Sequence, residues 1–122
     1  MSYEAYKIVH LMSVFAIFAI LGGQCVYAIN GGTRATNRAG RLSAIILGVA
    51  LLIAIVAGFG LLARLDLMAD LPGWVWVKLA IWLLAAFYSG LPFRYPALAK
   101  PLLIALPFLG LAAAWLAISK PF

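Results

Sequence analysis

Two residues in this sequence place ionisable groups inside apolar segments: His10 in KIVHLMSVFAIF and Lys78 in WVWVKLAIWLL. A neutral imidazole can bind haem iron as an axial ligand through one of its ring nitrogens. A lysine ammonium can pair with a propionate or another anion, and burial can turn it into a proton acceptor. Because ionisable groups are costly in hydrocarbon, each of these residues needs a structural or functional reason.

A plainer explanation exists for each residue. The four-carbon stem of Lys78 can carry its amine about one helical turn towards the membrane surface, where Asp66 or Asp70 could pair with it. His10 could be a neutral imidazole that bonds to a neighbouring helix. The sequence alone leaves the functional and the plain explanations evenly balanced.

The remaining residue types exclude several other functions. One histidine and one cysteine cannot supply the four ligands of a structural zinc site. No serine–histidine–acid set is evident, and no glycine-rich phosphate loop precedes a helix. Transporters usually carry an ionisable residue at the midplane of a membrane helix, and no apolar segment of this sequence has one.

The segments that carry His10 and Lys78 have the composition of a membrane protein. Hydrophobic residues make up 67% of the chain and charged residues only 10%, whereas ordinary globular domains have about 25% charged residues. An α-helix needs about 20 apolar residues to cross about 30 Å of hydrocarbon. We therefore predict an all-α, polytopic membrane protein, a single domain over 1–122 with four transmembrane helices in a bundle of two helical hairpins. The predicted helices span about 4–29, 42–63, 71–91 and 97–118.

Charge predicts how these helices are oriented in the membrane. The loops at 30–41 and 91–100 contain five basic residues and no acid, whereas all three acids fall near the opposite ends of the helices. By the positive-inside rule we predict that both basic loops are cytoplasmic and both termini periplasmic, in a bacterial inner membrane. Topology and contact with anionic lipid then explain the net charge of +6, and no nucleic-acid partner is expected.

A shared depth in the membrane brings the candidate residues together. Tyr6, His10 and Ser13 fall on one face of the first predicted helix, and His10 lies about two turns from its outer end. Lys78 lies about two turns into the third helix from the same side. We therefore predict an outer-leaflet pocket lined by His10, Lys78, Ser13 and Tyr6, with Asp70 nearby, provided that the first and third helices are neighbours.

These segments resemble a known group of small membrane proteins. KIVHLMSVFAIF, residues 7–18, resembles the opening K-x-x-H helix of HemJ-type protoporphyrinogen oxidases, and the small four-helix SirB-like and CopD-like membrane proteins look similar. GWVWVKLAIWLLAAFY, residues 73–88, is similar to their lysine-containing third helix. The resemblance implies haem binding for His10 and a role in activity for Lys78.

Two departures from that pattern argue against carrying the oxidase activity over. The oxidases have an arginine after the apolar run of the first helix, where this chain has GGQCVY at 22–27. They also tend to have a histidine after the third-helix lysine, where this chain has Phe87 and Tyr88.

We therefore expect a non-catalytic accessory or binding protein in membrane redox or haem metabolism, whose pocket takes haem b or another anionic hydrophobic cofactor. One alternative is a purely structural subunit of a homo-oligomer or larger membrane complex, which the small residues Ala50, Ala54 and Gly58 at four-residue spacing favour. The other alternative is a HemJ-like oxidase in which His10 and Lys78 are catalytic.

Overall fold

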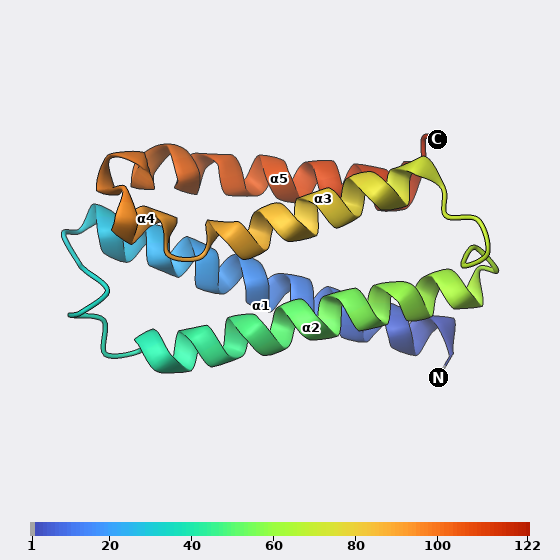
Figure 1. Ribbon diagram of the computed structural model, residues 1–122, viewed down its shortest axis with the longest axis horizontal. Coiled ribbons are helices and arrows are strands. Elements are labelled where there is room, and N and C mark those ends of the chain that lie inside the picture. Colours follow the sequence, from blue (N-terminus) through green and yellow to red (C-terminus); the bar gives the residue numbers. More distant parts are fainter. Residues whose placement is uncertain (1) are drawn as a thin grey trace.

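The chain is all-helical in the computed structural model, which describes residues 2–122. Four long helices run up and down side by side, and both termini lie at the same end (Figure 1). The elements in chain order are α1 (Tyr3–Ile29), α2 (Gly40–Arg64), α3 (Gly73–Tyr88), the short α4 (Leu91–Arg94), the 3₁₀ turn η1 (Pro96–Leu98) and α5 (Ala99–Ser119). The predicted all-α class is confirmed for the residues that are described.

Three of the helical segments are long and apolar enough to cross a membrane. They are Tyr3–Ile29, Gly40–Arg64 and Pro96–Ser119, and α3 is a shorter apolar helix of 16 residues. At about 1.5 Å per residue, α3 spans about 24 Å, which is less than the hydrocarbon thickness of about 30 Å. Three helices can therefore cross a membrane by length and composition, and the fourth apolar helix is shorter than the others.

The third helix is shorter than predicted at both of its ends. Pro72 has extended backbone angles, and α3 begins directly after it at Gly73. At the other end Gly90 has a φ of +81°, a left-handed conformation that glycine adopts without steric cost. The predicted loop 91–100 is therefore not a simple loop: it contains α4, η1 and the first residues of α5.

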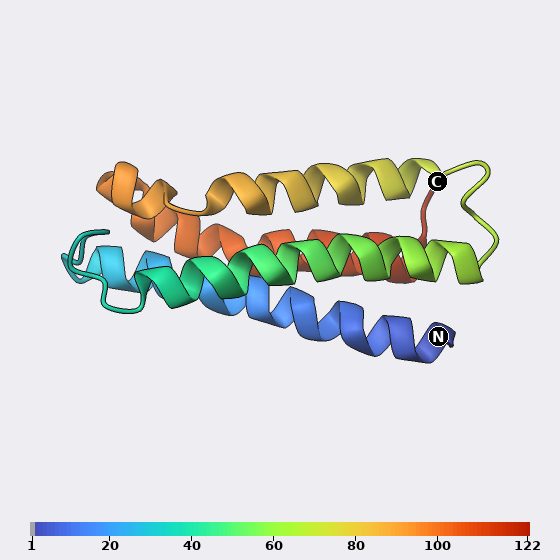
Figure 2. The same ribbon diagram turned by 60° about the horizontal axis from the view of Figure 1, so that its bottom comes forward.

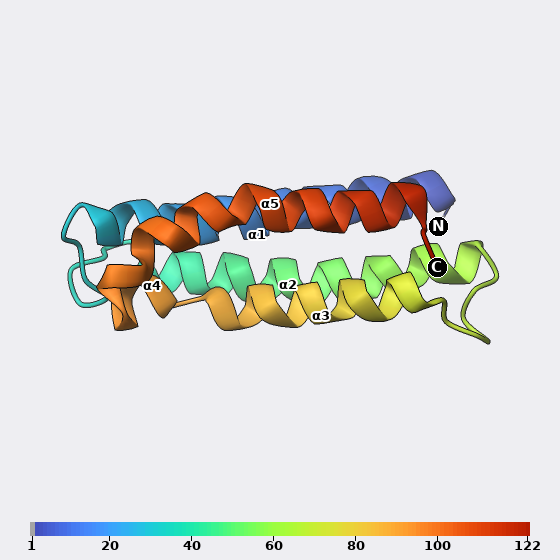
Figure 3. The same cartoon turned by 90° about the horizontal axis from the view of Figure 1, so that it is seen from above.

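Each long helix has two close neighbours. Helix α1 packs along α2 and, less extensively, along α5, while α3 packs against α5 and makes fewer contacts with α2. In Figure 3 α1 and α5 form one layer and α2 and α3 the other, and Figure 2 shows the same helices from a second direction. Helices α1 and α3 thus lie diagonally across the bundle, and they are not the neighbours that the predicted pocket assumed.

Small residues on α2 allow α1 to approach closely. Ala50 and Ala54 are buried, as the small-residue spacing suggests for a packed face. Gly60 lies under the ring of Tyr6, and a side chain at Gly60 would occupy the same space as that ring. The small-residue face of α2 is therefore used for packing within this chain.

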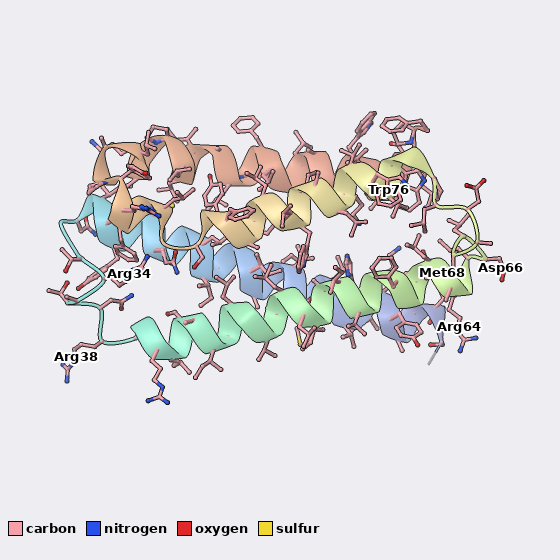
Figure 4. The ribbon with its side chains drawn as sticks, in the orientation of Figure 1. Arg34, Arg38, Arg64, Asp66, Met68 and Trp76 are labelled. Carbon is pink, nitrogen blue, oxygen red and sulfur yellow. The ribbon has the colours of Figure 1, made fainter. Side chains whose placement is uncertain are left out.

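One end of the bundle is rich in arginine residues, and the other contains both chain termini. We call the "arginine end" the end formed by residues 24–41 and 88–102, and the "terminal end" the half of the bundle formed by residues 2–11, 54–82 and 114–122. Figure 4 shows Arg34 and Arg38 at the first and Arg64, Asp66 and Met68 at the second. The outward faces between the two ends are apolar, with Phe15 70% and Phe108 66% exposed, as expected for helices that face lipid.

Polar side chains tie the elements of the arginine end together. The side-chain carbonyl of Gln24 accepts a hydrogen bond from the buried backbone N–H of Gly90 at 3.0 Å. The hydroxyl of Tyr88 donates to the carbonyl of Leu102 and so joins α3 to α5. The hydroxyl of Tyr27 donates to Thr36 at 2.8 Å. The main buried cluster, which includes Leu21, Cys25 and Tyr88, reaches into this end.

Candidate functional site

A cavity of about 530 Å³ opens inside the terminal end of the bundle. We call it the central cavity. All four long helices contribute to its wall, among them His10 of α1, Ala54 and Gly58 of α2, Lys78 of α3 and Ala117 of α5. Its volume falls in the range of about 300–1,000 Å³ that is usual for ligand pockets. Small residues on α2 and α5, namely Ala54, Gly58, Ala114 and Ala117, form part of the wall and leave space between the helices.

A second hollow of about 570 Å³ adjoins the central cavity and lies between α1 and α5. We call it the α1–α5 groove. The residues shared by the two hollows are His10, Leu11, Lys78, Ala114 and Ala117. Because the two hollows share these walls, His10 and Lys78 stand at the point where they meet.

The imidazole of His10 is fixed by α2. Its Nδ1 lies 2.9 Å from the backbone carbonyl oxygen of Ala54, and the ring packs against Gly58. A carbonyl oxygen only accepts, so Nδ1 carries the hydrogen and Nε2 of the neutral ring has a free lone pair. Nε2 makes no hydrogen bond within residues 2–122. Every fully buried side-chain nitrogen or oxygen in these residues has a partner, so Nε2 is not fully buried. Nε2 is therefore accessible, and His10 lines both hollows.

The ammonium group of Lys78 also faces open space. No hydrogen bond to Nζ is made within the described chain, and the residue is only half-buried. Neither Asp66 nor Asp70 lines the central cavity or the α1–α5 groove, so the partner expected for a snorkelling lysine is not at hand. The other charged residues that line the central cavity are Lys7 and Lys120, which are also cations.

Two further lysines stand at the mouth of the central cavity. Lys7 lies on α1, one turn from His10, and its Nζ is 5.8 Å from the ring centroid of Tyr3. Lys120 follows α5, and its Nζ is 5.8 Å from the ring centroid of Trp74. The two cation–π contacts hold these amines without neutralising them. Within residues 2–122, no aspartate or glutamate lines either hollow, so the only charged side chains in their walls are those of lysines.

The structure places the other predicted pocket residues elsewhere. The hydroxyl of Ser13 donates to the backbone carbonyl of His10 in the same helix at 2.6 Å, and this side chain is buried. The ring of Tyr6 lies against Gly60 of α2. Neither residue lines the central cavity or the groove. A shared helical face correctly groups residues by angle, but it does not say which of them meets a neighbouring helix and which meets a cavity.

Lys7 and Lys120 were not predicted as site residues, because in the sequence they contribute only to the net charge of +6. Their sequence positions contain a usable signal, because both lie at the same end of the bundle as Lys78 once four helices are assumed. The contribution of Trp82 was not foreseen either. Its indole N–H donates to the carbonyl of Leu51 at 2.9 Å and ties α3 to α2 across the wall of the cavity.

The donor set decides which metal group this site can hold. No group of three histidine, cysteine, aspartate or glutamate side chains lies close enough to bind a bare ion in the part of the chain that is described. A porphyrin brings four nitrogen ligands of its own and needs only an axial ligand from the protein. The free Nε2 of His10 and the unpaired amines near it fit such a group.

Comparisons with known proteins do not extend this description. Scans against protein-family models, curated proteins and solved structures find no match for this chain. The functional argument therefore rests on the residues and their geometry.

Proposed function

We propose that this chain is a four-helix bundle of the bacterial inner membrane, with both termini in the periplasm. Three membrane-length apolar helices, a shorter apolar fourth and two termini at one end support this arrangement. The arginine end, which contains the basic segments 30–41 and 91–100, is then cytoplasmic. The central cavity opens near the periplasmic face.

In this membrane the protein binds an anionic hydrophobic cofactor and has no catalytic role of its own. The observation that carries this proposal is the pairing of a fixed imidazole, with its Nε2 lone pair free, and an unpaired lysine on the wall of one cavity. Apolar walls favour a hydrophobic molecule, and the lysines favour one that bears acid groups. A polar residue in hydrocarbon that lacks a protein partner is typical of a functional site.

Haem b is the specific cofactor that we propose. Nε2 of His10 would ligate the iron, and the hydrogen bond from Nδ1 to Ala54 would fix the ring orientation and strengthen its basicity. Lys78, with Lys7 or Lys120, would pair with the propionates. When bound, haem would supply one-electron redox chemistry, while the chain positions the group and keeps water from it.

The alternatives have less support from the geometry. Ala50 and Ala54 on the small-residue face of α2 are buried and α2 packs along α1, which weakens one sequence argument for a purely structural subunit. A HemJ-like oxidase remains a third proposal. It requires oxygen- or quinone-dependent turnover of a porphyrinogen, and that turnover must be lost in Lys78→Ala.

An absorption spectrum of the purified protein tests the haem proposal. We expect a Soret band that stays with the protein after unbound haem is removed by gel filtration in mild detergent, and its loss in His10→Ala. Ser13→Ala is the matched control, because its hydroxyl bonds within α1 and does not reach the cavity. A wild-type protein without a Soret band would remove the haem version, as would an unchanged band in His10→Ala.

A further inference from the structure

The α1–α5 groove has features that a haem site does not need. Its lining runs along α5 from Leu103 to Ala117 and along α1 from His10 to Gly22. At about 1.5 Å per residue, these stretches are about 21 Å and about 18 Å long. One leaflet of a bilayer has about half of the 30 Å hydrocarbon thickness. The groove is therefore long enough for a hydrocarbon chain that reaches from one membrane face to the midplane.

The groove is apolar and open to the side. Its walls are formed by residues such as Val14, Phe18 and Leu106, and Gly110 leaves a space beside the ring of Phe18. The rim residues Leu11 and Phe15 are 45% and 70% exposed, so they face the lipid. A molecule dissolved in the bilayer can enter between α1 and α5 without passing through water.

Charge lies at only one end of the groove. Lys78 stands where the groove meets the central cavity, and Lys7 and Lys120 stand beyond it at the cavity mouth. At the other end, around Gly22 and Leu103, the lining is apolar. A molecule that matches both the charged end and the apolar end of the groove has one acidic head and one long hydrocarbon tail.

We propose that the α1–α5 groove binds a single-chain carboxylic acid, a long-chain fatty acid, that enters sideways from the bilayer and places its carboxylate at Lys78, Lys7 and Lys120. One groove between one pair of helices holds one chain, which argues against a two-chain phospholipid. The inference rests on the proposed function only in treating the central cavity as a binding site, and it does not need the haem iron or the His10 ligand.

The test uses the full chain in phosphatidylcholine vesicles. The probe is stearic acid with a nitroxide near its terminal methyl group, and electron paramagnetic resonance measures the motionally restricted fraction. We expect a saturable restricted component at one site per chain, which the methyl ester and a phosphatidylglycerol with the same label do not give. A stronger restricted component from the phosphatidylglycerol would overturn the single-chain assignment.

Two variants test separately the binding of the acidic head and the binding of the hydrocarbon tail. Lys78→Met should weaken acid binding by about tenfold, the loss expected for one charge-assisted contact. Gly110→Phe should abolish the restricted component by filling the groove, whereas Leu111→Phe, one position along and 65% exposed outside the groove, should leave it unchanged. Equal binding by wild type, Gly110→Phe and Lys78→Met would overturn the proposal.

The haem proposal and the fatty-acid proposal can be refuted separately by these two experiments. Restricted acid without a Soret band supports the groove proposal and removes the haem version of the function. A Soret band without restricted acid keeps the haem site and overturns the groove proposal.

Discussion

The two ends of the bundle treat their polar groups in opposite ways. At the arginine end, Gln24, Tyr27 and Tyr88 each have a hydrogen-bond partner on another part of the fold. At the terminal end, Lys78 has no hydrogen-bond partner and His10 uses only one of its two ring nitrogens, within residues 2–122. Polar groups in a membrane stabilise a bundle when they are paired, so the pairs stabilise the first end, and the unpaired groups of the second end agree with the binding role that we propose for it.

The difference in packing follows the same division. The buried cluster of Leu21, Cys25 and Tyr88 extends into the arginine end, whereas the terminal end contains the central cavity. Filling this cavity with larger side chains would gain dispersion contacts, and the sequence instead has Ala54, Gly58 and Ala117 there. The comparison predicts that substitutions at the two ends change different measurable properties.

The largest loss of stability should come from the packed cluster. Leu21 is 0% exposed, and Leu21→Ala should lower the free energy of unfolding by about 2 kcal/mol or more, because it leaves a cavity among buried side chains. Leu52→Ala on the lipid side of α2, where the leucine is 62% exposed, is the matched control and should cost far less. Titration with a denaturing detergent measures both. Equal losses would contradict the assignment of Leu21 to a packed core.

A smaller loss is expected at the turn between α3 and α4. Gly90 has a φ of +81°, so Gly90→Ala should destabilise the protein by about 1–2 kcal/mol. The new methyl group would also displace the guanidinium of Arg34. Gly48→Ala on α2 has open space around it and should be neutral or slightly stabilising. Thermal unfolding followed by circular dichroism distinguishes the two, and the same sign for both would refute this reading of the turn.

Removal of one paired polar group should cost less again. Gln24→Ala leaves the buried N–H of Gly90 without its acceptor and should reduce stability by about 1 kcal/mol. Ser89→Ala removes only a long 3.5 Å contact from an exposed residue and should have little effect. Hydrogen exchange at the Gly90 amide should become faster in the first variant alone. Unchanged exchange there would mean that Gln24 does not protect this amide.

The smallest effect on stability, with the opposite sign, is expected at Lys78. Lys78→Met removes an amine that has no protein partner, so stability without ligand should stay the same or rise slightly. The same variant should lose affinity for anionic ligands. A loss of stability in Lys78→Met as large as that in Gln24→Ala would mean that Lys78 has a structural partner. The contrast between the two ends would then be wrong.

The all-helical fold could be predicted from composition and the lengths of apolar segments, because these depend only on the properties of single segments. The short α3 could not, because its ends depend on Pro72 and on the left-handed Gly90 that starts α4. His10 and Lys78 could be singled out because ionisable residues are costly in hydrocarbon.

The walls of the site could not be predicted. They depend on which helices are neighbours, and the diagonal placement of α1 and α3 turns Tyr6 towards Gly60 and brings Lys7 and Lys120 to the cavity. No single helix contains that information.

Nitrogen NMR of His10 tests the central claim most directly. The chain contains one histidine, so ¹⁵N-labelled histidine reports on this side chain alone in a membrane sample. We predict a neutral ring with the proton on Nδ1 and an unprotonated Nε2, whose resonance alone shifts strongly when haem is added. A ring with its proton on Nε2, or an Nε2 resonance that haem leaves unchanged, would contradict the proposal that His10 offers a ligand to the central cavity.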